Sequence, residues 1–202
     1  MRKRLWIIAG FLILAGFGAG ILFTRYQRYE YAQKIHQKRI IQYRESDLPE
    51  EDSEVYAVLR IPALDVICPV AAGAEEEKLK AYVCIVQGGD LPGEADGNTV
   101  IAGHSARGSF LCDFCWFQNI ARLKEGDELL LEFQNDSVYR YVVYEVLVDQ
   151  AVGDLEPFQR VPGKEVLTLQ TCTDGKHDAR TYVHAYRAFG SGFEEDVPLQ
   201  LK

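Results

Sequence analysis

The hydrophobic and polar positions divide the chain into an apolar run, a polar stalk and a body of short apolar segments. Residues 5–23 contain no charged side chain. As a helix rising about 1.5 Å per residue, this run would be roughly 28 Å long, close to the hydrocarbon thickness of a bilayer. No polar face interrupts the run, as one would in a helix of a soluble core. The pattern therefore predicts a transmembrane helix at 5–23, preceded by a short N-terminus of residues 1–4.

A cleaved secretory signal is the competing interpretation of the same run. The apolar region of such a signal is usually about 7–15 residues long and ends in a cleavage site with small residues. Here the run is longer, and further apolar residues follow the cluster of small residues at 18–20. These features favour an uncleaved signal anchor.

Residues 24–54 have the pattern of a polar helical stalk followed by a linker. The stretch 46–53 is acidic and contains Pro49, which marks the end of the stalk. We therefore place a folded domain at 55–202.

This body has the pattern of a small, mainly β domain. Short β-branched and aromatic runs alternate in it with turn residues, such as Gly126 and the pair Asn135-Asp136. Eight such runs predict a closed barrel or a sandwich. Two further stretches, 75–80 and 113–123, have helical patterns. The predicted strands are 55–61, 66–71, 82–87, 99–102, 128–133, 138–148, 166–171 and 181–189.

Composition and charge narrow the functional classes. Of the 202 residues, 48% are hydrophobic and 26% charged, which is typical of a globular protein and excludes a disordered chain. The 30 acidic residues exceed the 22 basic ones, so a general electrostatic binder of nucleic acid is excluded. Nine of the basic residues and only one acid precede residue 45. A basic head is thus joined to a strongly acidic body.

The basic residues on the two sides of 5–23 leave its orientation open. More of them follow the run than precede it, and by the positive-inside rule alone the body would be cytoplasmic. Long domains, however, are translocated largely regardless of such charges. The orientation of the run therefore has to be inferred from the chemistry of the body.

The five cysteines are an odd number, so at least one thiol is free unless it pairs between chains. Cys68 and Cys84 lie in apolar runs and are expected in the core. Cys112 and Cys115 have the C-x-x-C spacing of redox and zinc sites, but no second pair of ligands follows. We interpret them as two thiols at the start of a helix, with a disulfide or a metal site as the alternatives.

Cys172 differs from the other cysteines, because it ends a predicted strand and a loop follows at once. Arg180 begins the next strand. If the two strands pair across the loop, the thiol and the guanidinium share one rim of the sheet. A guanidinium there would stabilise a thiolate and could donate hydrogen bonds to a developing oxyanion.

His104 follows another predicted strand, after the flexible Gly103. An imidazole close to a thiol can carry a proton to a departing amine. His177, in the loop between Cys172 and Arg180, is the reserve candidate. The spacing alone leaves open that these residues have separate structural roles.

Several motifs together resemble the sortases, the membrane-anchored cysteine transpeptidases of Gram-positive bacteria. The most specific combination is TLQTC ending in Cys172, with Arg180 in the next strand and an upstream IAGH ending in His104. The resemblance covers essentially the whole chain, including the N-terminal apolar run. Its other matching stretches are 59–62, 68–70, 92–93, 98–104 and 123–127.

The resemblance implies an eight-stranded sortase β-barrel in which Cys172 is the nucleophile, His104 the general acid and base, and Arg180 the substrate clamp and oxyanion stabiliser. It implies cleavage of an LPxTG-like sorting signal between Thr and Gly through a thioester. The protein so cleaved would be transferred to an amine of a peptidoglycan precursor or of a pilin. Thr171 and Ser105 match positions of substrate or oxyanion contacts, and no cofactor is implied.

Within this family, the chain resembles class A or class D. It has no C-terminal apolar anchor and no Asp-Pro-aromatic lid motif before the barrel, which disfavours the pilin-polymerising class. The short connection between Tyr144 and Val166 leaves little room for the long helix of the class that handles haem-related proteins. Glu94 and Asp96 alone do not reproduce the acidic set with which some members bind calcium, so we expect no metal.

The resemblance also predicts the orientation, with the N-terminus in the cytoplasm and the catalytic domain outside the cell, where sorting substrates and wall acceptors lie. Two alternatives remain. One is a hydrolytic cysteine peptidase, in which water resolves the thioester. The other is a membrane-anchored binding module of the cell surface, in which Cys172 is only structural.

Overall fold

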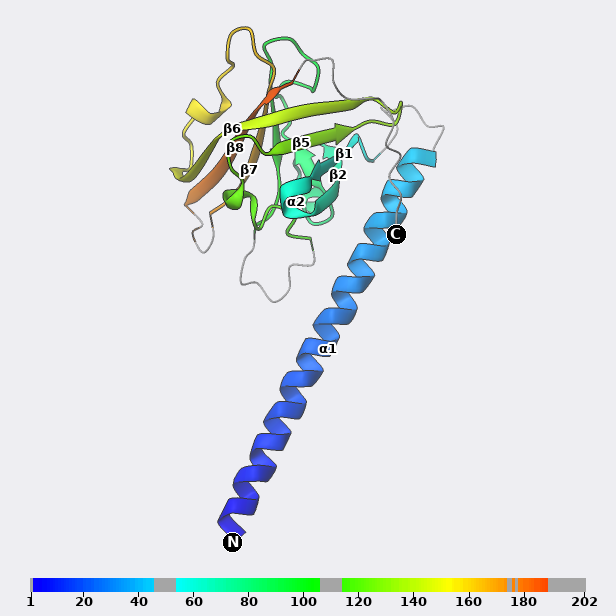
Figure 1. Cartoon of the computed structure of the whole chain (residues 1–202), viewed down its shortest axis with the longest axis vertical. Helices are drawn as coiled ribbons and strands as arrows, with labels where there is room; N and C mark the ends of the chain where they lie inside the picture. Colours follow the sequence, from blue (N-terminus) through cyan, green and yellow to red (C-terminus); the bar gives the residue numbers. More distant parts are fainter. Residues whose placement is uncertain (1, 46–53, 106–113, 174–175, 177, 189–202) are drawn as a thin grey trace.

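The computed structural model describes residues 2–45, 54–105, 114–173, 176 and 178–188, except for the side chains of residues 2–13 and of Gln33. These residues form one long helix, α1 (Arg2–Glu45), and a closed barrel of eight strands in the order β1-β2-β3-β4-β7-β8-β6-β5. Figure 1 shows the barrel beside the C-terminal end of α1, with the rest of the helix extending away from it. The predicted eight-stranded, mainly β architecture is confirmed.

The direction of the strands decides which loops meet at each end of the barrel. Two neighbouring pairs, β2 with β3 and β4 with β7, are parallel, and the other six are antiparallel. The C-terminal ends of β4 and β7 therefore lie at the same end. The strands are β1 (Ala57–Ile61), β2 (Val66–Ala72), β3 (Val83–Ile85), β4 (Asn98–Ala102), β5 (Glu128–Glu132), β6 (Val138–Ala151), β7 (Val166–Cys172) and β8 (Ala179–Arg187).

Alternating side chains of the strands fill the interior of the barrel. Leu129 and Leu131 of β5 and Leu167 and Leu169 of β7 are fully buried in one hydrophobic cluster. Successive side chains of a strand point to opposite faces, so the residues between them point away from the interior of the barrel. Burial of this apolar surface is the main favourable contribution to folding.

The predicted turns have the expected backbone conformations. Asp136 has a φ of 62° in the hairpin between β5 and β6, and Asn135 Oδ1 accepts a hydrogen bond from Ser137 N at 3.1 Å. Gly126 has a φ of 92° in the turn before β5, a conformation that glycine adopts without strain.

The helix predicted at 113–123 is wrong for the part that is described. Residues 114–123 form turns and one short 3-10 helix, η3 (Ile120–Arg122). The buried residues Phe117, Ile120 and Leu123 recur every three residues, which is the period of a 3-10 turn and not of an α-helix. The helix predicted at 75–80 is present as α2 (Glu76–Leu79). The connection from β6 to β7 is short and contains only the 3-10 helix η4 (Glu156–Phe158) within 152–165.

The first part of the predicted stalk is helical, since α1 continues through it to Glu45, and the assignment of 24–54 as a stalk and linker stays a prediction. Within the described part of the chain, no helix is long and apolar enough to cross a membrane. The side chains of residues 5–13 of the predicted span, and the linker 46–53, lie outside the described residues. The transmembrane assignment of 5–23 stays a prediction.

Candidate active site

Two neighbouring strands place Cys172 directly opposite Arg180. The last residue pair of the antiparallel strands β7 and β8 joins Cys172 to Arg180. Directly opposed residues of an antiparallel pair have Cβ atoms about 4.5–5.5 Å apart and lie on the same face. Both side chains are half-buried, and the thiol of Cys172 is free. The predicted pairing of these strands across their loop is confirmed.

Alternation along β7 separates this pair from the core. Leu167 and Leu169 face the interior of the barrel, so Cys172 lies on the outer face. By the same alternation, Val183 of β8 faces the interior and Arg180 lies outside. Cys172 and Arg180 are therefore at the rim of the barrel, where both side chains are partly exposed.

His104 reaches the same rim because β4 is parallel to β7. Gly103, the residue before it, donates its N–H to Gln170 O at 3.0 Å and accepts a hydrogen bond at its carbonyl oxygen from Thr171 Oγ1 at 2.7 Å. His104 itself is half-buried, and its carbonyl oxygen accepts a hydrogen bond from Phe117 N at 3.2 Å. The main chain of His104 is thus held between β7 and the segment around Phe117.

Gly103 is the residue that permits this close approach. A Cβ atom at this position would lie 2.7 Å from Cδ2 of Phe117 and 3.0 Å from Cγ1 of Val83. Any side chain would therefore force the exit of β4 away from the Phe117 ring.

A small cavity of about 80 Å³ lies beside Cys172. Ser105 and Thr171, each 5% exposed, contribute to its lining. The Thr171 hydroxyl donates to Gly103 O, so in this structure it joins β7 to the residue before His104. The substrate contacts predicted for Thr171 and Ser105 stay predictions. The other lining residues are Phe117, Gln118, Ala121, Val148, Thr173 and Thr181.

The remaining cysteines have other environments. Cys68 and Cys84 are free and fully buried, as predicted, and burial raises the pKa of the Cys84 thiol to about 11. Cys115 is disulfide-bonded, so its interpretation as a thiol is wrong and the disulfide alternative is correct. A C-x-x-C spacing is compatible with both states, and the redox environment decides between them. Cys112 lies outside the described residues.

The other histidines do not reach this rim in the part of the chain that is described. His184, in the middle of β8, is 4% exposed, and its Nδ1 lies 3.0 Å from Thr168 Oγ1. Burial lowers the pKa of His184 to about 4. The reserve candidate His177 lies outside the described residues.

Among the residues that the structure describes, no group of three or more His, Cys, Asp or Glu side chains could hold a metal ion. The two carboxylates considered for calcium bind main-chain groups. Glu94 Oε1 accepts from Leu91 N at 2.9 Å, and Asp96 Oδ1 accepts from Gly163 N at 2.7 Å.

This geometry can be compared with known proteins. Residues 59–188, more than half of the chain, match the family model of the Sortase domain. The chain belongs to the sortase family.

Individual sortases are similar to this chain over most of its length. Sortase A of Bacillus anthracis is 28% identical over 154 residues, which cover 76% of this chain and 68% of that protein. The crystal structure of sortase C1 from Streptococcus suis is 26% identical, with a TM-score of 0.60 over 67% of this chain and 73% of the other. Sortase C-1 from Streptococcus pneumoniae is 26% identical, with a TM-score of 0.61 over 74% and 77%. Because both sortase A and sortase C occur among these proteins, the assignment to class A or D stays a prediction.

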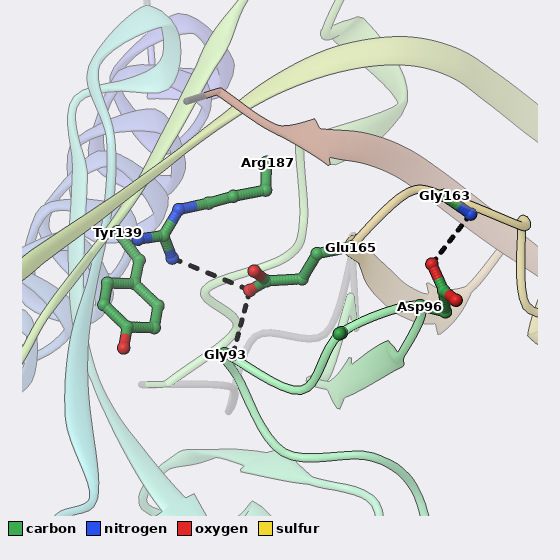
Figure 2. A pocket seen from close by; sticks show the side chains of 7 residues that line it. Gly93, Asp96, Tyr139, Gly163, Glu165 and Arg187 are labelled. Atoms are coloured by element: carbon green, nitrogen blue, oxygen red, sulfur yellow. Dashed lines mark hydrogen bonds and ion pairs between the residues drawn. The ribbon is translucent and has the colours of Figure 1, made fainter. Parts of the chain in front are cut away.

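A second cavity of this sortase, of about 340 Å³, lies at the other end of β7 and β8 from Cys172. Glu165, just before β7, is 6% exposed and accepts hydrogen bonds from Gly93 N at 2.9 Å and from Tyr141 Oη at 2.5 Å. Arg187, the last residue of β8, pairs with Glu165 at 3.6 Å and stacks on Tyr139. Figure 2 shows the Glu165 carboxylate between Arg187 and Gly93.

This polar cluster has no counterpart among the features predicted from the sequence. Its members are separated by up to 94 positions along the chain, from Gly93 to Arg187, so no local pattern connects them. One signal for it is present in the sequence. Glu165 lies directly before the predicted strand 166–171, and Arg187 lies near the end of the predicted strand 181–189.

Proposed function

We propose that this sortase is a cysteine transpeptidase in which Cys172 is the nucleophile, His104 the general acid and base, and Arg180 the substrate clamp and oxyanion stabiliser. The observation that carries the proposal is the cross-strand pair of Cys172 and Arg180 at the rim to which β4 delivers His104. Among the described cysteines, Cys172 is the one free thiol that is not fully buried. A partly exposed thiol on a rim that also carries an arginine and a histidine suits nucleophilic catalysis.

In the first step, Cys172 Sγ attacks the carbonyl carbon of Thr in an LPxTG-like sorting signal. A C–S bond forms, and the guanidinium of Arg180 donates hydrogen bonds to the oxyanion. Protonated His104 then gives its proton to the Gly nitrogen, the C–N bond between Thr and Gly breaks, and a thioester remains on Cys172.

In the second step, an amine attacks the thioester carbon and neutral His104 takes the proton that this amine loses. The C–S bond breaks and the thiolate of Cys172 is regenerated. The acceptor amine belongs to a peptidoglycan precursor of the cell wall or to a pilin. Attack by water at the same carbon would give hydrolysis in place of transfer.

We further propose that residues 5–23 anchor the protein in the cell membrane, with residues 1–4 in the cytoplasm and the barrel outside the cell. The uncharged run is long enough to span a bilayer. The disulfide at Cys115 supports an external barrel, because disulfides are rare in the reducing cytosol.

The test is mass spectrometry of the full chain in detergent micelles, incubated with a panel of LPxTG-type peptides with and without a glycine-based amine. We expect a thioester adduct on Cys172 that the amine converts into a transpeptidated product. Cys172→Ala should abolish the adduct without unfolding the barrel. The buried-thiol control Cys84→Ala should retain it, because Cys84 is fully buried away from the rim.

The absence of an adduct from a folded chain with a titratable Cys172 thiol, across the whole panel, would refute the transpeptidase and support the binding module. An adduct that releases only hydrolysed product, at every amine concentration, would support the hydrolytic peptidase.

A further inference from the structure

The C-terminal part of α1 packs against the outside of the barrel. Ala32, His36, Ile40 and Tyr43 are each at most 9% exposed, and their spacing puts them on one face of the helix. Ile40 and Tyr43 belong to a hydrophobic cluster with residues of β1, β2 and β3. Tyr43 Oη donates to Tyr56 O at 2.7 Å. Figure 1 shows this end of α1 beside the barrel.

His36 occupies an apolar site in this interface. It is 2% exposed, and its ring meets Phe114 and Trp116 edge-on, at centroid distances of 4.7 and 4.4 Å. Within the described structure, neither ring nitrogen of His36 has a hydrogen-bond partner, and the buried Trp116 Nε1 has none either.

Packing alone does not account for a histidine at this position. A buried polar atom without a partner disfavours the state that buries it, and a phenyl or isobutyl group would fill the same space without this cost. An imidazole differs from these groups in one respect, since it takes up a proton close to neutral pH.

The residues that contact His36 also support the candidate catalytic histidine. Phe114 and Trp116 lead directly into Phe117, whose N–H donates to His104 O at 3.2 Å. The Phe117 ring is fully buried and lies against Gly103. A displacement of residues 114–117 would therefore move the main chain of His104.

We propose that His36 of the docked helix is a positioning residue for His104, and that protonation of His36 releases this end of α1 from the barrel. The positioning role rests on the function proposed above for His104. Neutral His36 holds the 114–117 segment in place, and an imidazolium in the same apolar site would lose its solvation without gaining a counter-ion from the residues that the structure describes.

The charges around the interface disfavour the protonated form when α1 is docked. Burial first, and the positive charge of Arg39 second, lower the pKa of His36 to about 4. Arg39 lies over the Tyr82 ring and donates to Ala81 O at 3.4 Å. Nearby, the carboxylates of Glu54 and Glu75 interact with Tyr82 and Lys78 respectively. His36 binds a proton more tightly when α1 is released than when α1 is docked. Below pH 6.5 the equilibrium constant for docking α1 onto the barrel therefore falls by up to tenfold per pH unit, down to about pH 4.

The first experiment follows the fluorescence of Trp116 in the full chain in micelles. A Trp6→Phe background leaves Trp116 as the single tryptophan. We expect its emission to shift to longer wavelength between pH 6.5 and 4, while near-UV circular dichroism shows a folded barrel. The shift should be absent from His36→Phe and from His36→Leu. The control Gln37→His, which adds a histidine on the exposed side of α1, should keep the shift.

The second experiment measures the positioning role without any sorting signal. The rate of Cys172 alkylation by iodoacetamide, resolved by peptide mass spectrometry, reports on the histidine beside the thiol. We expect the rate in the wild-type chain to fall, between pH 6.5 and 4, more steeply than in His36→Phe. In a His104→Ala background, His36→Phe should no longer change the profile.

An emission shift that persists in His36→Phe and His36→Leu, or no shift in the wild-type chain, would overturn the release of α1. Identical alkylation profiles for the wild type and His36→Phe would overturn the positioning of His104. A failure of the proposed function is distinguishable, because it would appear as missing thioester adducts while the emission shift of Trp116 is intact.

Discussion

Gly103 fixes the position of His104, because the space around its α-carbon is filled by Phe117 and Val83. We expect Gly103→Ala to lower the free energy of unfolding by about 1–3 kcal/mol, as overpacking of a core does. The formation of thioester should slow as well, since His104 would be displaced. Urea denaturation and adduct kinetics measure the two effects. The double variant Gly103→Ala with Phe117→Leu should recover part of the activity, and a double variant no better than the single one would contradict this steric explanation.

Thr171, next to Cys172 in sequence, lies on the opposite face of β7 and lines the small cavity beside Cys172. Its hydroxyl donates to Gly103 O at 2.7 Å, and its side chain is 5% exposed. Thr171→Val keeps the shape but leaves a buried carbonyl oxygen without this donor, so we expect a loss of about 1–3 kcal/mol in stability. Thr171→Ser keeps the hydroxyl and is the matched control. Equal unfolding free energies for the Val and Ser variants, in urea titrations, would show that the hydrogen bond contributes nothing.

Asn98, the first residue of β4, holds the connection between β6 and β7. Its Nδ2 donates to Pro157 O at 3.3 Å and to Gln159 O at 3.2 Å, and its Oδ1 accepts from Thr168 Oγ1 at 2.7 Å. We expect Asn98→Ala to cost about 1–3 kcal/mol, because these buried groups lose their partners. Amide hydrogen exchange of residues 152–165 should accelerate.

The matched control for Asn98 is Arg160→Ala, which breaks the ion pair of Arg160 with Asp90 in the same region. The Arg160 side chain is 64% exposed, so solvent screens this ion pair and it contributes little to stability. Comparable exchange in the two variants would contradict the role of Asn98.

The strands could be predicted from the sequence because each has one face in the core. In β5, Leu129 and Leu131 are buried and their neighbours are partly exposed, so the period of two is visible locally. The end of β6 could not be placed in this way. Residues 148–151 are mostly exposed on both faces and lack an apolar period. The helix predicted at 113–123 was wrong for a different reason. The buried residues of this segment recur every three positions, which is close to the 3.6 residues per turn of an α-helix.

The candidate site was predictable only where its contacts are local or belong to a known motif. Cys172 and Arg180 are joined by a short loop, so their pairing follows from two adjacent strands. The parallel alignment of β4 with β7, which brings His104 to them, connects residues about 68 positions apart and has no local signal. His104 was therefore identified through the resemblance. For the same reason the burial of His36 against Trp116 could not be seen in the sequence.

The two ends of the barrel have different chemistry in the complete molecule. At one end, Cys172 and Arg180 form a partly exposed rim next to a small cavity. At the other end, Glu165 and Arg187 form a buried ion pair beside the larger cavity.

Removing one partner of a buried pair leaves an uncompensated charge, so Glu165→Ala should destabilise the protein by about 3–5 kcal/mol. The adduct chemistry at Cys172 should persist at low temperature, since Glu165 lies at the opposite end. Calorimetry and adduct kinetics would separate these effects, and loss of activity from a stably folded variant would contradict the separation of the two ends.

A buried histidine makes the stability of the barrel depend on pH. Burial lowers the pKa of His184 to about 4, whereas it titrates near 6.5 in the unfolded chain. The unfolded state therefore binds more protons below pH 6.5, and the free energy of unfolding falls as the pH decreases from 6.5 towards 4, by up to about 3 kcal/mol. Above pH 6.5 this contribution is fully present.

His184→Gln can still form a hydrogen bond with Thr168 but does not titrate. Urea denaturation at pH 7, 5.5 and 4 measures the free energy of unfolding of the wild type and of His184→Gln. As the pH falls, the difference between the two should shift by up to about 3 kcal/mol in favour of the variant. Carboxylates titrate equally in both proteins, so a difference that stays constant over this range would contradict the burial of His184 in its neutral form.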